Sequence, residues 1–242
     1  MKAIFFKEIK EFFTSPIGYI AMGIFFLFNS LFLWIIDGNF NIPNSQFADL
    51  TPFFNLAPWI LIFVMAAISM RMFSEEFKSG TIESLLTKPL LSFEIVLGKF
   101  FAVWSIGIMM VVPTLIYVVS IQALSVDGNL DWGSITTAYV GLLILMSAFA
   151  AIGIFASILF NNQVNAFLVG LFLMFLFYYG FEGLGNFNLL GNLDLFVQKL
   201  SLNMHYQNLL KGLISLADIT YLLSISILFI FLTYNVLQNK IK

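Results

Sequence analysis

Residues 71–99 read Arg71-Met-Phe-Ser-Glu-Glu-Phe-Lys-Ser-Gly-Thr-Ile-Glu-Ser-Leu-Leu-Thr-Lys-Pro-Leu-Leu-Ser-Phe-Glu-Ile-Val-Leu-Gly-Lys99. This segment holds four of the eleven basic residues and four of the thirteen acidic residues, whereas the long apolar runs around it hold almost none. Charged side chains are costly inside a bilayer, so we expect this segment to be a loop between membrane spans. A membrane protein that gathers its charges into one loop offers a docking surface to a partner in the cytoplasm.

The composition of the chain excludes a soluble fold. Of its 242 residues, 60% are hydrophobic and 10% are charged, and the mean hydropathy is +0.97. Soluble domains carry roughly 25% charged residues. Backbone groups in lipid must pair internally, which leaves helices or a closed barrel. The apolar runs are continuous over about 20 residues, so they predict helices rather than the alternating strands of a barrel.

The apolar runs predict six spanning helices in a single transmembrane domain, residues 1–242. We place these helices at about residues 17–36, 55–70, 98–121, 135–160, 164–180 and 219–237. Pro113 lies within the third helix and predicts a kink there. A stripe of small residues marks the fourth helix and predicts a close contact with a neighbouring helix. Its members are Ser147, Ala150, Gly153 and Ser157.

Two further segments are too polar to span a membrane. Residues 1–15 carry Phe5, Ile9, Phe12 and Phe13 at helical spacing, opposite charged side chains. That pattern is typical of a helix lying in the membrane interface. Residues 181–218 combine glycine and asparagine with an amphipathic stretch, and we expect short re-entrant or interfacial helices on the outer side.

The distribution of basic residues predicts the orientation of the chain. With six spans, nine of the eleven basic residues fall on one side, and all six aspartates fall on the other. Basic residues favour the cytoplasmic side. We therefore expect both termini and the loop of residues 71–99 in the cytoplasm. The nine residues are Lys2, Lys7, Lys10, Arg71, Lys78, Lys88, Lys99, Lys240 and Lys242.

The charged loop itself has helical signals. Glu75 and Glu76 should extend the second spanning helix beyond the membrane surface. Gly80 can adopt the left-handed conformation that ends a helix. Thr81 can then act as the N-cap of a new short helix, with Glu83 in its first turn, where a negative charge is favoured by the helix dipole.

The new helix is predicted to be short and amphipathic. Ile82, Leu85 and Leu86 share one face, and the residue before Pro89 disfavours the helical conformation, so the helix should stop there. The result is a small, stiff knob that could insert into a groove on a partner. The alternative is a solvated loop that only reverses the chain direction.

Two stretches of the sequence resemble the ABC-2 type permease family. The first is Glu75-Glu76-x-x-x-Gly80-Thr81-x-Glu83-x-Leu85-Leu86-x-x-Pro89 followed by Gly98-Lys99, and the second is Lys7-Glu8-x-x-Glu11-x-x-x-Ser15-Pro16. The length and the order of the spans are also similar to that family. Within it, the phenylalanine-rich sequence most resembles the permease subunit associated with gliding motility in Bacteroidetes.

The resemblance implies a type V exporter-like fold, a location in the bacterial inner membrane and a mode of action. It implies a dimer, formed with a second copy of the chain or supplemented by an accessory membrane subunit, in which each half docks a separate ABC ATPase chain. ATP and magnesium would bind to that partner. A coupling helix at about residues 81–87 would make the contact, and residues 181–218 would form outer re-entrant helices. The implied coupling residues are Glu75, Glu76, Gly80, Thr81, Glu83, Leu85, Leu86 and Pro89.

The sequence also lacks the motifs of nucleotide-binding, metal-binding and nucleic-acid-binding sites. Gly98-Lys99 is followed by Phe100 and has no upstream phosphate-loop glycine, so it is not a nucleotide site. Cysteine is absent, His205 is the single histidine, and no basic tract suggests nucleic-acid binding. We expect no catalytic residue, metal site or cofactor on this chain, and the bilayer as its solvent.

Three functions remain open on the sequence. The favoured one is an ATP-driven permease subunit that exports a molecule or transmits force. A non-transporting membrane scaffold of a motility or secretion complex would use the same loop. A secondary transporter is less favoured, because no ionisable residue lies in the middle of a predicted span.

Overall fold

The structure is a computed structural model, and it describes residues 1–45, 49–82, 91–125, 130–187 and 191–241. Within these ranges every regular element is a helix. Six helical segments are long and apolar enough to cross a membrane, which confirms the predicted all-α class and number of spans. They are Pro16–Ile35, Thr51–Ser79, Ser92–Leu124, Trp132–Leu159, Gln163–Asn186 and Leu216–Lys240.

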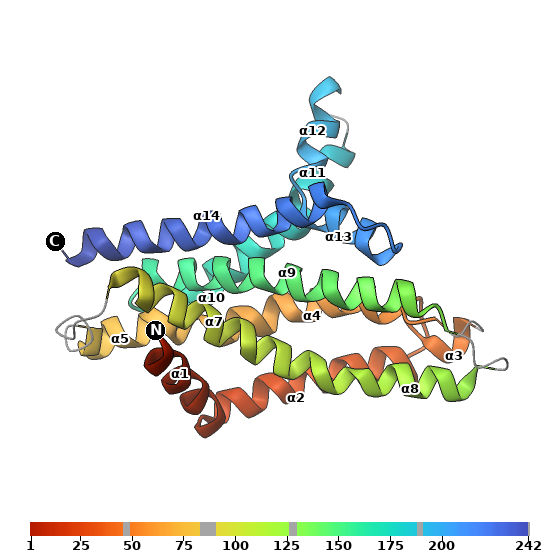
Figure 1. Ribbon diagram of the computed structural model, residues 1–242, viewed down its shortest axis with the longest axis horizontal. Coiled ribbons are helices and arrows are strands. Elements are labelled where there is room, and N and C mark those ends of the chain that lie inside the picture. The colour runs from red at the N-terminus through yellow and green to blue at the C-terminus, as the bar shows by residue number, and fades with distance from the viewer. Residues whose placement is uncertain (46–48, 83–90, 126–129, 188–190, 242) are drawn as a thin grey trace.

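Several spans are built from more than one element (Figure 1). The π-helical turn η1 ends the first span, and the π-helical turn η3 continues the fifth span. The turns η2 and η4 are 3-10 helices. The elements are α1 (Lys2–Thr14), α2 (Pro16–Ser30), η1 (Leu31–Ile35), α3 (Ile42–Ser45), α4 (Thr51–Ser69), α5 (Arg71–Ser79), α7 (Ser92–Val111), η2 (Val112–Thr114), α8 (Leu115–Leu124), α9 (Trp132–Leu159), α10 (Gln163–Phe175), η3 (Leu176–Gly180), α11 (Phe181–Asn186), η4 (Gly191–Leu193), α12 (Asp194–Gln198), α13 (Leu202–Leu210) and α14 (Leu216–Ile241).

Two prolines explain local departures from straight helix. Pro113 lies in η2, which separates α7 from α8, so the predicted interruption of the third span is confirmed. Proline lacks the N–H that the helical ladder needs. The second span begins earlier than predicted, at Thr51, because Pro52 suits the first turn of a helix. The Asp49 carboxylate, two residues before this start, accepts a hydrogen bond from the Thr51 N–H at 3.0 Å.

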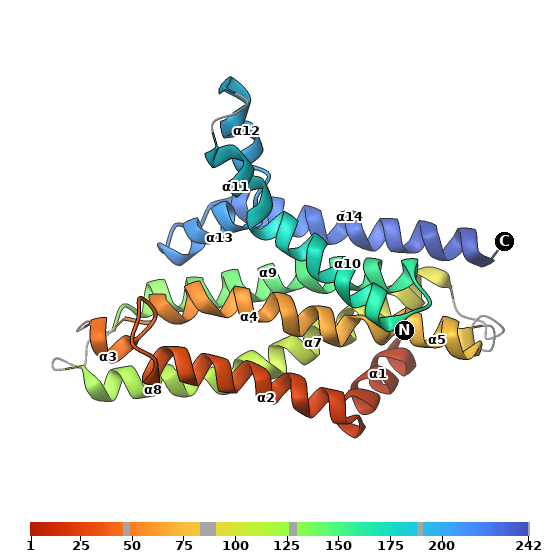
Figure 2. The ribbon, with the colours of Figure 1, turned by 180° about the vertical axis from the view of Figure 1, so that it is seen from behind.

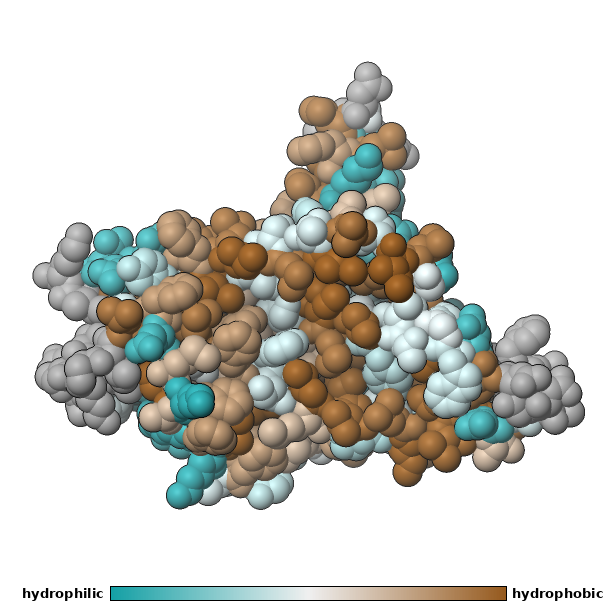
Figure 3. Space-filling view, in the orientation of Figure 1, coloured by the Kyte–Doolittle hydropathy of each residue, from teal (hydrophilic) through white to brown (hydrophobic). Residues whose placement is uncertain are grey.

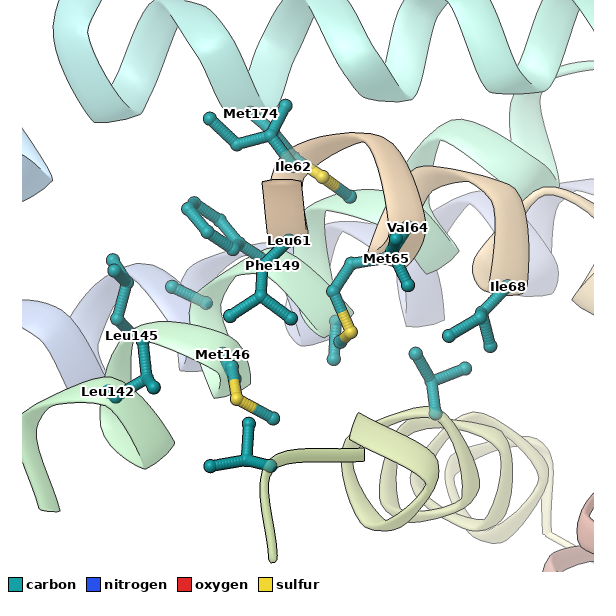
Figure 4. Packing of buried hydrophobic residues seen from close by; sticks show 14 of the residues in the cluster. Leu61, Ile62, Val64, Met65, Ile68, Leu142, Leu145, Met146, Phe149 and Met174 are labelled. Carbon is teal, nitrogen blue, oxygen red and sulfur yellow. The ribbon is translucent and has the colours of Figure 1, made fainter. Parts of the chain in front are cut away.

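Helix α9 runs through the middle of the bundle and contacts α4, α5, α7, α10, α13 and α14. Figure 4 shows Met65 of α4 and Met146 and Phe149 of α9 in this core, with Met174 of α10 above them. All four side chains are fully buried. Lipid tails are as apolar as these side chains, so close packing rather than removal from water must hold the helices together.

The small residues of α9 make this close packing possible. A Cβ atom added at Gly153 would lie 2.7 Å from Cβ of Ser69 on α4 and 2.8 Å from Cε of Met174 on α10. Ser147 Oγ lies 2.9 Å from Ser226 Oγ of α14. The contact predicted from the stripe of small residues is therefore confirmed, and it involves three neighbouring helices.

The two ends of the bundle differ in charge. We call the end that holds α1, α5 and the C-terminal turns of α14 the basic end, and Figure 1 shows both termini there. The opposite end, which holds Asp37, Asp49 and Asp131, is called the acidic end. Figure 3 shows hydrophobic residues across the middle of the molecule and hydrophilic residues toward both ends. This pattern fits a bundle that spans a membrane.

The segment of residues 181–218 forms short helices, as predicted. The fifth span continues through η3 into α11 as far as Asn186, six residues beyond the predicted end at Gly180. Helices α11 and α12 pack against each other and project from the side of the bundle (Figures 1 and 2). Helix α13 packs against α9 and α14. Tyr206 of α13 donates to the Phe54 carbonyl of α4 at 3.0 Å, which ties this segment to the core.

Candidate functional site

The basic end contains a buried lysine that joins three helices. Lys99 on α7 is fully buried, and its Nζ lies 2.7 Å from Oε1 of Glu8 on α1 and 3.0 Å from Oε2 of Glu76 on α5. The same nitrogen donates to the Met72 carbonyl at 2.5 Å. The Glu76 contact is an ion pair at an angle that makes no hydrogen bond. A buried charge is stable only when it is paired in this way.

Lys7 completes the charge cluster from the solvent side. Its Nζ donates to Oε1 of Glu76 at 3.0 Å and lies 3.9 Å from Oε1 of Glu8. Burial by itself would lower the pKa of Lys7, but the hydrogen bond to Glu76 and the charges of Glu76, Glu8 and Glu11 outweigh it and raise the pKa above its usual value. The cluster of Lys7, Glu8, Glu76 and Lys99 thus alternates two cations with two anions.

The sequence of α1 places Glu8 on the face that meets the bundle. Ile4, Glu8 and Phe12 are spaced by four residues, lie on one side of α1, and are all buried. Gly98 lets this face approach α7 closely, because a Cβ atom there would lie 3.1 Å from Cβ of Ile4 and 3.2 Å from the Met1 carbonyl oxygen. The Gly98-Lys99 pair therefore combines close approach with a charge that binds α1.

A second contact joins α5 to the start of the first span. Arg71 Nη1 donates to Ser15 Oγ at 2.6 Å, and its Nε lies 3.8 Å from Glu75 Oε2. Ser15 is the N-cap of α2, and its hydroxyl also accepts from the Ile17 N–H at 3.2 Å. Pro16 occupies the first position of that helix, which suits proline.

The junction between α4 and α5 is held by a serine from the central helix. The helix is interrupted at Met70, between Ser69 and Arg71. Ser157 Oγ of α9 accepts from the N–H groups of Phe73 at 2.9 Å and Ser74 at 3.2 Å, and donates to the Met70 carbonyl at 2.8 Å. One hydroxyl therefore satisfies three backbone groups at the break, as buried polar groups require.

The last helix is also attached at the basic end. Lys240 of α14 donates to the Ile158 carbonyl at 2.7 Å, and its Nζ lies 4.2 Å from the centre of the Phe77 ring. The cation thus satisfies a carbonyl in the last turn of α9 and stacks on an aromatic side chain of α5.

A polar groove runs between α1 and α5. It has a volume of about 740 Å³, and the charge cluster forms part of its wall. Glu11 and Glu75, whose side chains are about half exposed, flank it, and Thr81 lies at its rim. The groove carries more carboxylates than basic groups, because Glu8, Glu11, Glu75 and Glu76 face Lys7 and Arg71. It would suit a basic segment of a partner.

The residues predicted to form the coupling site fall into three groups. Glu75 and Thr81 are exposed, and Gly80 has φ +71° and ends α5 in the left-handed conformation, as predicted. Glu76 is buried in the charge cluster, so it faces the bundle and not a partner. Glu83, Leu85, Leu86 and Pro89 lie outside the described residues.

The described part of the predicted coupling helix consists of two residues. Thr81 and Ile82 are helical, and Thr81 is already inside the helix instead of preceding it as an N-cap. Its Oγ1 lies 2.8 Å from Ser79 Oγ. Ile82, the first apolar residue of the predicted coupling helix, is buried.

Sequence reasoning gave no role to Glu8 or Lys99, although both lie in the quoted motifs. Glu8 interrupts an apolar stripe between Ile4 and Phe12, and that interruption was the available signal for a buried charge. Ser157 was identified only as a small packing residue. Its hydrogen bonds to α5 depend on where α9 crosses the Met70 break, which the sequence does not reveal.

The acidic end holds the histidine in a hydrogen-bonded network. His205 Nδ1 lies 2.6 Å from Asp218 Oδ1, its Nε2 lies 2.9 Å from the Lys199 carbonyl, and its ring stacks on Tyr221. The network fastens α13 to α14. Among the described residues, no group of three or more His, Asp or Glu side chains is placed to hold a metal ion.

Two aromatic side chains of the fifth span are covered by neighbouring helices. Tyr178 is buried and packs edge-on against Trp59 of α4 and Phe149 of α9. Phe177 is half-buried and packs against Phe229 of α14. Hydropathy does not show which face of a helix a neighbouring helix covers.

Comparison with known proteins agrees with this architecture. No curated protein matches the chain. A family model described as "ABC-2 family transporter protein" matches residues 2–238, which include both motifs and all six spans. The resemblance seen in the sequence is thus confirmed for the family. With a match over almost its whole length, the chain belongs to the ABC-2 transporter family, as a multi-pass permease component of an ABC transporter and not as its ATPase.

Proposed function

We propose that this permease component is driven by a separate ATP-hydrolysing chain that docks on the basic end from the cytoplasm. Seven of the nine basic residues that the structure describes lie on the elements of the basic end, which favours a cytoplasmic location of this end in the bacterial inner membrane. ATP and magnesium would bind to the partner. The docking contact would be made by the short helix that begins at Thr81, together with the exposed face of α5.

One observation carries this proposal: α5 has one face open to a partner and another bonded to the bundle. Glu75 and Glu76 are consecutive, and consecutive residues lie about 100° apart around a helix. Glu75 is exposed, whereas Glu76 is buried against Lys7 and Lys99. A displacement imposed on the Glu75 face is therefore passed through Glu76 to α1 and α7.

Helix α5 is attached firmly to the membrane spans. α5 continues α4 across the Met70 break, and the Ser157 hydroxyl fixes that break to α9. Three contacts thus join the docking face to the spans: the Met70 break, the charge cluster and the Arg71–Ser15 hydrogen bond. Packed helices move as rigid bodies, so motion at α5 would tilt α4 and α7 together.

The assembly that we propose contains two permease halves, each with its own ATPase contact. The second half would be another copy of this chain, alone or together with an accessory membrane subunit. The cellular role that we propose is gliding motility, supported by the similarity of the phenylalanine-rich sequence to the motility-associated permease subunit. The output would be export of a molecule or transmission of force.

Co-expression with ATPase chains of the same genome tests the docking. We expect one such chain to co-purify with the permease and to hydrolyse ATP faster in the complex. Glu75→Lys should weaken co-purification and stimulation, because the altered side chain lies on the exposed face. Asp37→Lys is the matched control, since Asp37 is an exposed carboxylate at the acidic end. Equal effects of the two substitutions, or no effect of either, would contradict the docking site.

The two rival functions give different results in the same preparation. A scaffold would bind the ATPase chain without any change in its hydrolysis rate. A secondary transporter would move its cargo in vesicles without an ATPase and with an ion gradient. The buried acidic and basic side chains among the described residues are Glu8, Glu76, Lys99, Asp194 and Asp218. None of them lies in the middle of a spanning helix, because they fall on α1, near the end of α5, in the first half of α7, on α12 and in the first turn of α14, which disfavours an ion relay at the midplane.

A further inference from the structure

An apolar groove lies along α4 between α2 and α10. It has a volume of about 540 Å³ and is lined by side chains such as Ile24 and Phe28 of α2, Ile60 and Phe63 of α4, and Phe167 of α10. Apart from the indole of Trp59, the lining is aliphatic or phenyl. Figure 2 shows α4 between the ribbons of α2 and α10 on this face of the bundle. A groove of this chemistry accepts hydrocarbon and excludes polar molecules.

The length of the groove matches one leaflet of a bilayer. Its lining on α4 runs from Leu56 to Ala67, and on the first span from Ala21 of α2 to Phe32 of η1. Eleven residues of helix rise about 16 Å, and one leaflet is about half of the roughly 30 Å hydrocarbon core. Leu56 lies in the second turn of α4, whose start is at the acidic end, and Ala67 lies close to its last residue, Ser69, so the groove follows the middle of this helix. Its dimensions therefore suit one extended hydrocarbon tail.

A polar chamber adjoins the groove at the acidic end. The chamber has a volume of about 520 Å³, and its lining includes Asn39, Asp49, Asn55, Asn203 and Gln207. Trp59 lines both the groove and the chamber, so the two adjoin at its ring. The combined shape has an apolar tail section and a polar head section.

The polar atoms of the chamber specify the head group. Gln207 Nε2 donates to Asn55 Oδ1 at 3.0 Å, and within the described part of the chain this leaves the Asn55 amide nitrogen and the Gln207 oxygen for a ligand. A donor beside an acceptor matches hydroxyl groups. The chamber lining contains no Lys, Arg or His among the described residues, and Asp49 is its one carboxylate. A phosphate needs cationic partners, so it is disfavoured here.

We propose that the groove and the chamber together bind a lipid-like molecule with a hydrocarbon tail and an uncharged, hydroxyl-rich head group. The tail would lie along α4 and the head would face Asn55 and Gln207. Binding of this molecule does not depend on the proposed function. Its identification as the transported cargo rests on the proposed function, because only an ATP-driven permease would move it.

Photo-crosslinking of the whole chain in nanodiscs tests the site without any ATPase. Three probes share a tail with a photoreactive group and differ in the head group, which is a neutral sugar, an amine or a phosphate. We expect the sugar probe to label Phe63 and Phe167 saturably, and the phosphate probe to bind about tenfold more weakly, the effect of one unsatisfied polar contact. The substitution Gln207→Leu should remove this discrimination, because it deletes the head-group contact and leaves the tail groove intact.

Tail length is tested separately with Ala67→Phe, which closes the end of the groove nearest the basic end. A probe with a tail as long as the groove should lose about tenfold in affinity, since it can no longer lie fully extended, while a probe with a short tail should bind unchanged. Ile227→Phe on α14 is the matched control, because Ile227 is exposed and does not line the groove.

Three results would overturn the site. They are unsaturable labelling spread equally over Ile227 and Phe63, tighter binding of the phosphate or amine probe, and occupation of the groove by a second copy of the chain, seen as a cross-linked dimer through Phe63. Failure of the proposed function is distinguishable: saturable binding of the sugar probe would persist while no ATPase chain is bound or stimulated.

Discussion

Lys99 and Glu8 are 91 residues apart in the chain, yet their charged atoms lie 2.7 Å apart and both side chains are buried. The pair fastens the N-terminal helix to the start of the third span. Glu76 adds the end of the second span to the same contact. The basic end is therefore a unit of α1, α5 and α7, joined by charge rather than by apolar packing alone.

Removal of the buried cation should destabilise the protein strongly. Lys99→Met leaves Glu8 and the Glu76 Oε2 atom without their buried partner, and loss of one partner of a buried ion pair costs about 3–5 kcal/mol. Thermal unfolding in detergent should show a large decrease in Tm for this variant. Lys2→Met, which removes an exposed lysine at the basic end, is the control and should leave Tm nearly unchanged.

The double variant refines this prediction. Glu8→Gln combined with Lys99→Met removes both charges of the closest pair, so the two effects on the free energy of unfolding should be less than additive. Additive effects would show that Lys99 is stabilised mainly by Glu76 and the Met72 carbonyl, and that Glu8 contributes little.

Close approach of α1 to α7 depends on Gly98. Gly98→Val should cost about 1–3 kcal/mol, because the new methyl groups would overlap Ile4 and the Met1 carbonyl. Hydrogen exchange should rise specifically in residues 2–14. Gly23→Val on α2 is the matched control, since no atom lies within 4 Å of its Cβ position. Equal loss of protection in both variants would show that α1 is held by the charge cluster and not by close packing.

Ser157 should stabilise the break at Met70. Ser157→Ala deprives the Phe73 and Ser74 N–H groups of their acceptor, and unsatisfied buried groups cost about 1–3 kcal/mol. Hydrogen exchange at residues 70–75 should increase. Ser224→Ala, which removes an exposed hydroxyl bonded within α14, should change stability by less than about 0.5 kcal/mol. No difference between the two variants would mean that the N–H groups of Phe73 and Ser74 find acceptors within their own helix.

The contribution of Lys7 should depend on pH only in the alkaline range. Its pKa is raised in the folded protein, so the ion pair with Glu76 stabilises the fold fully at pH values below the unfolded pKa of 10.5 and is lost as pH rises through the higher folded value. The Tm difference between the protein and Lys7→Met should stay constant from neutral pH up to that region and shrink above it. A difference that already falls between pH 7 and 9 would contradict this assignment.

The sequence predicted the elements of the fold better than the contacts between them. Continuous apolar runs located all six spans, since hydropathy depends only on local composition. Gly80 was predicted to end α5 because its conformational freedom is also local. Lys99 was not predicted to be buried, because its partners come from two helices that are distant in sequence. Glu8, Glu76 and Lys99 all lie in the two motifs, but only the folded chain shows that their side chains touch.

The cytoplasmic location of the docking face is tested most directly by labelling introduced cysteines from the two sides of the membrane, since the chain has no native cysteine. Lys78→Cys places a single thiol on the exposed face of α5, and Gly38→Cys places one at the acidic end, where no atom lies within 4 Å. With a membrane-impermeant maleimide, we expect residue 38 to react in intact cells and residue 78 to react only in inside-out vesicles. Addition of the ATPase chain to those vesicles should protect residue 78. Reaction of residue 78 from outside intact cells would contradict a cytoplasmic docking site at the basic end.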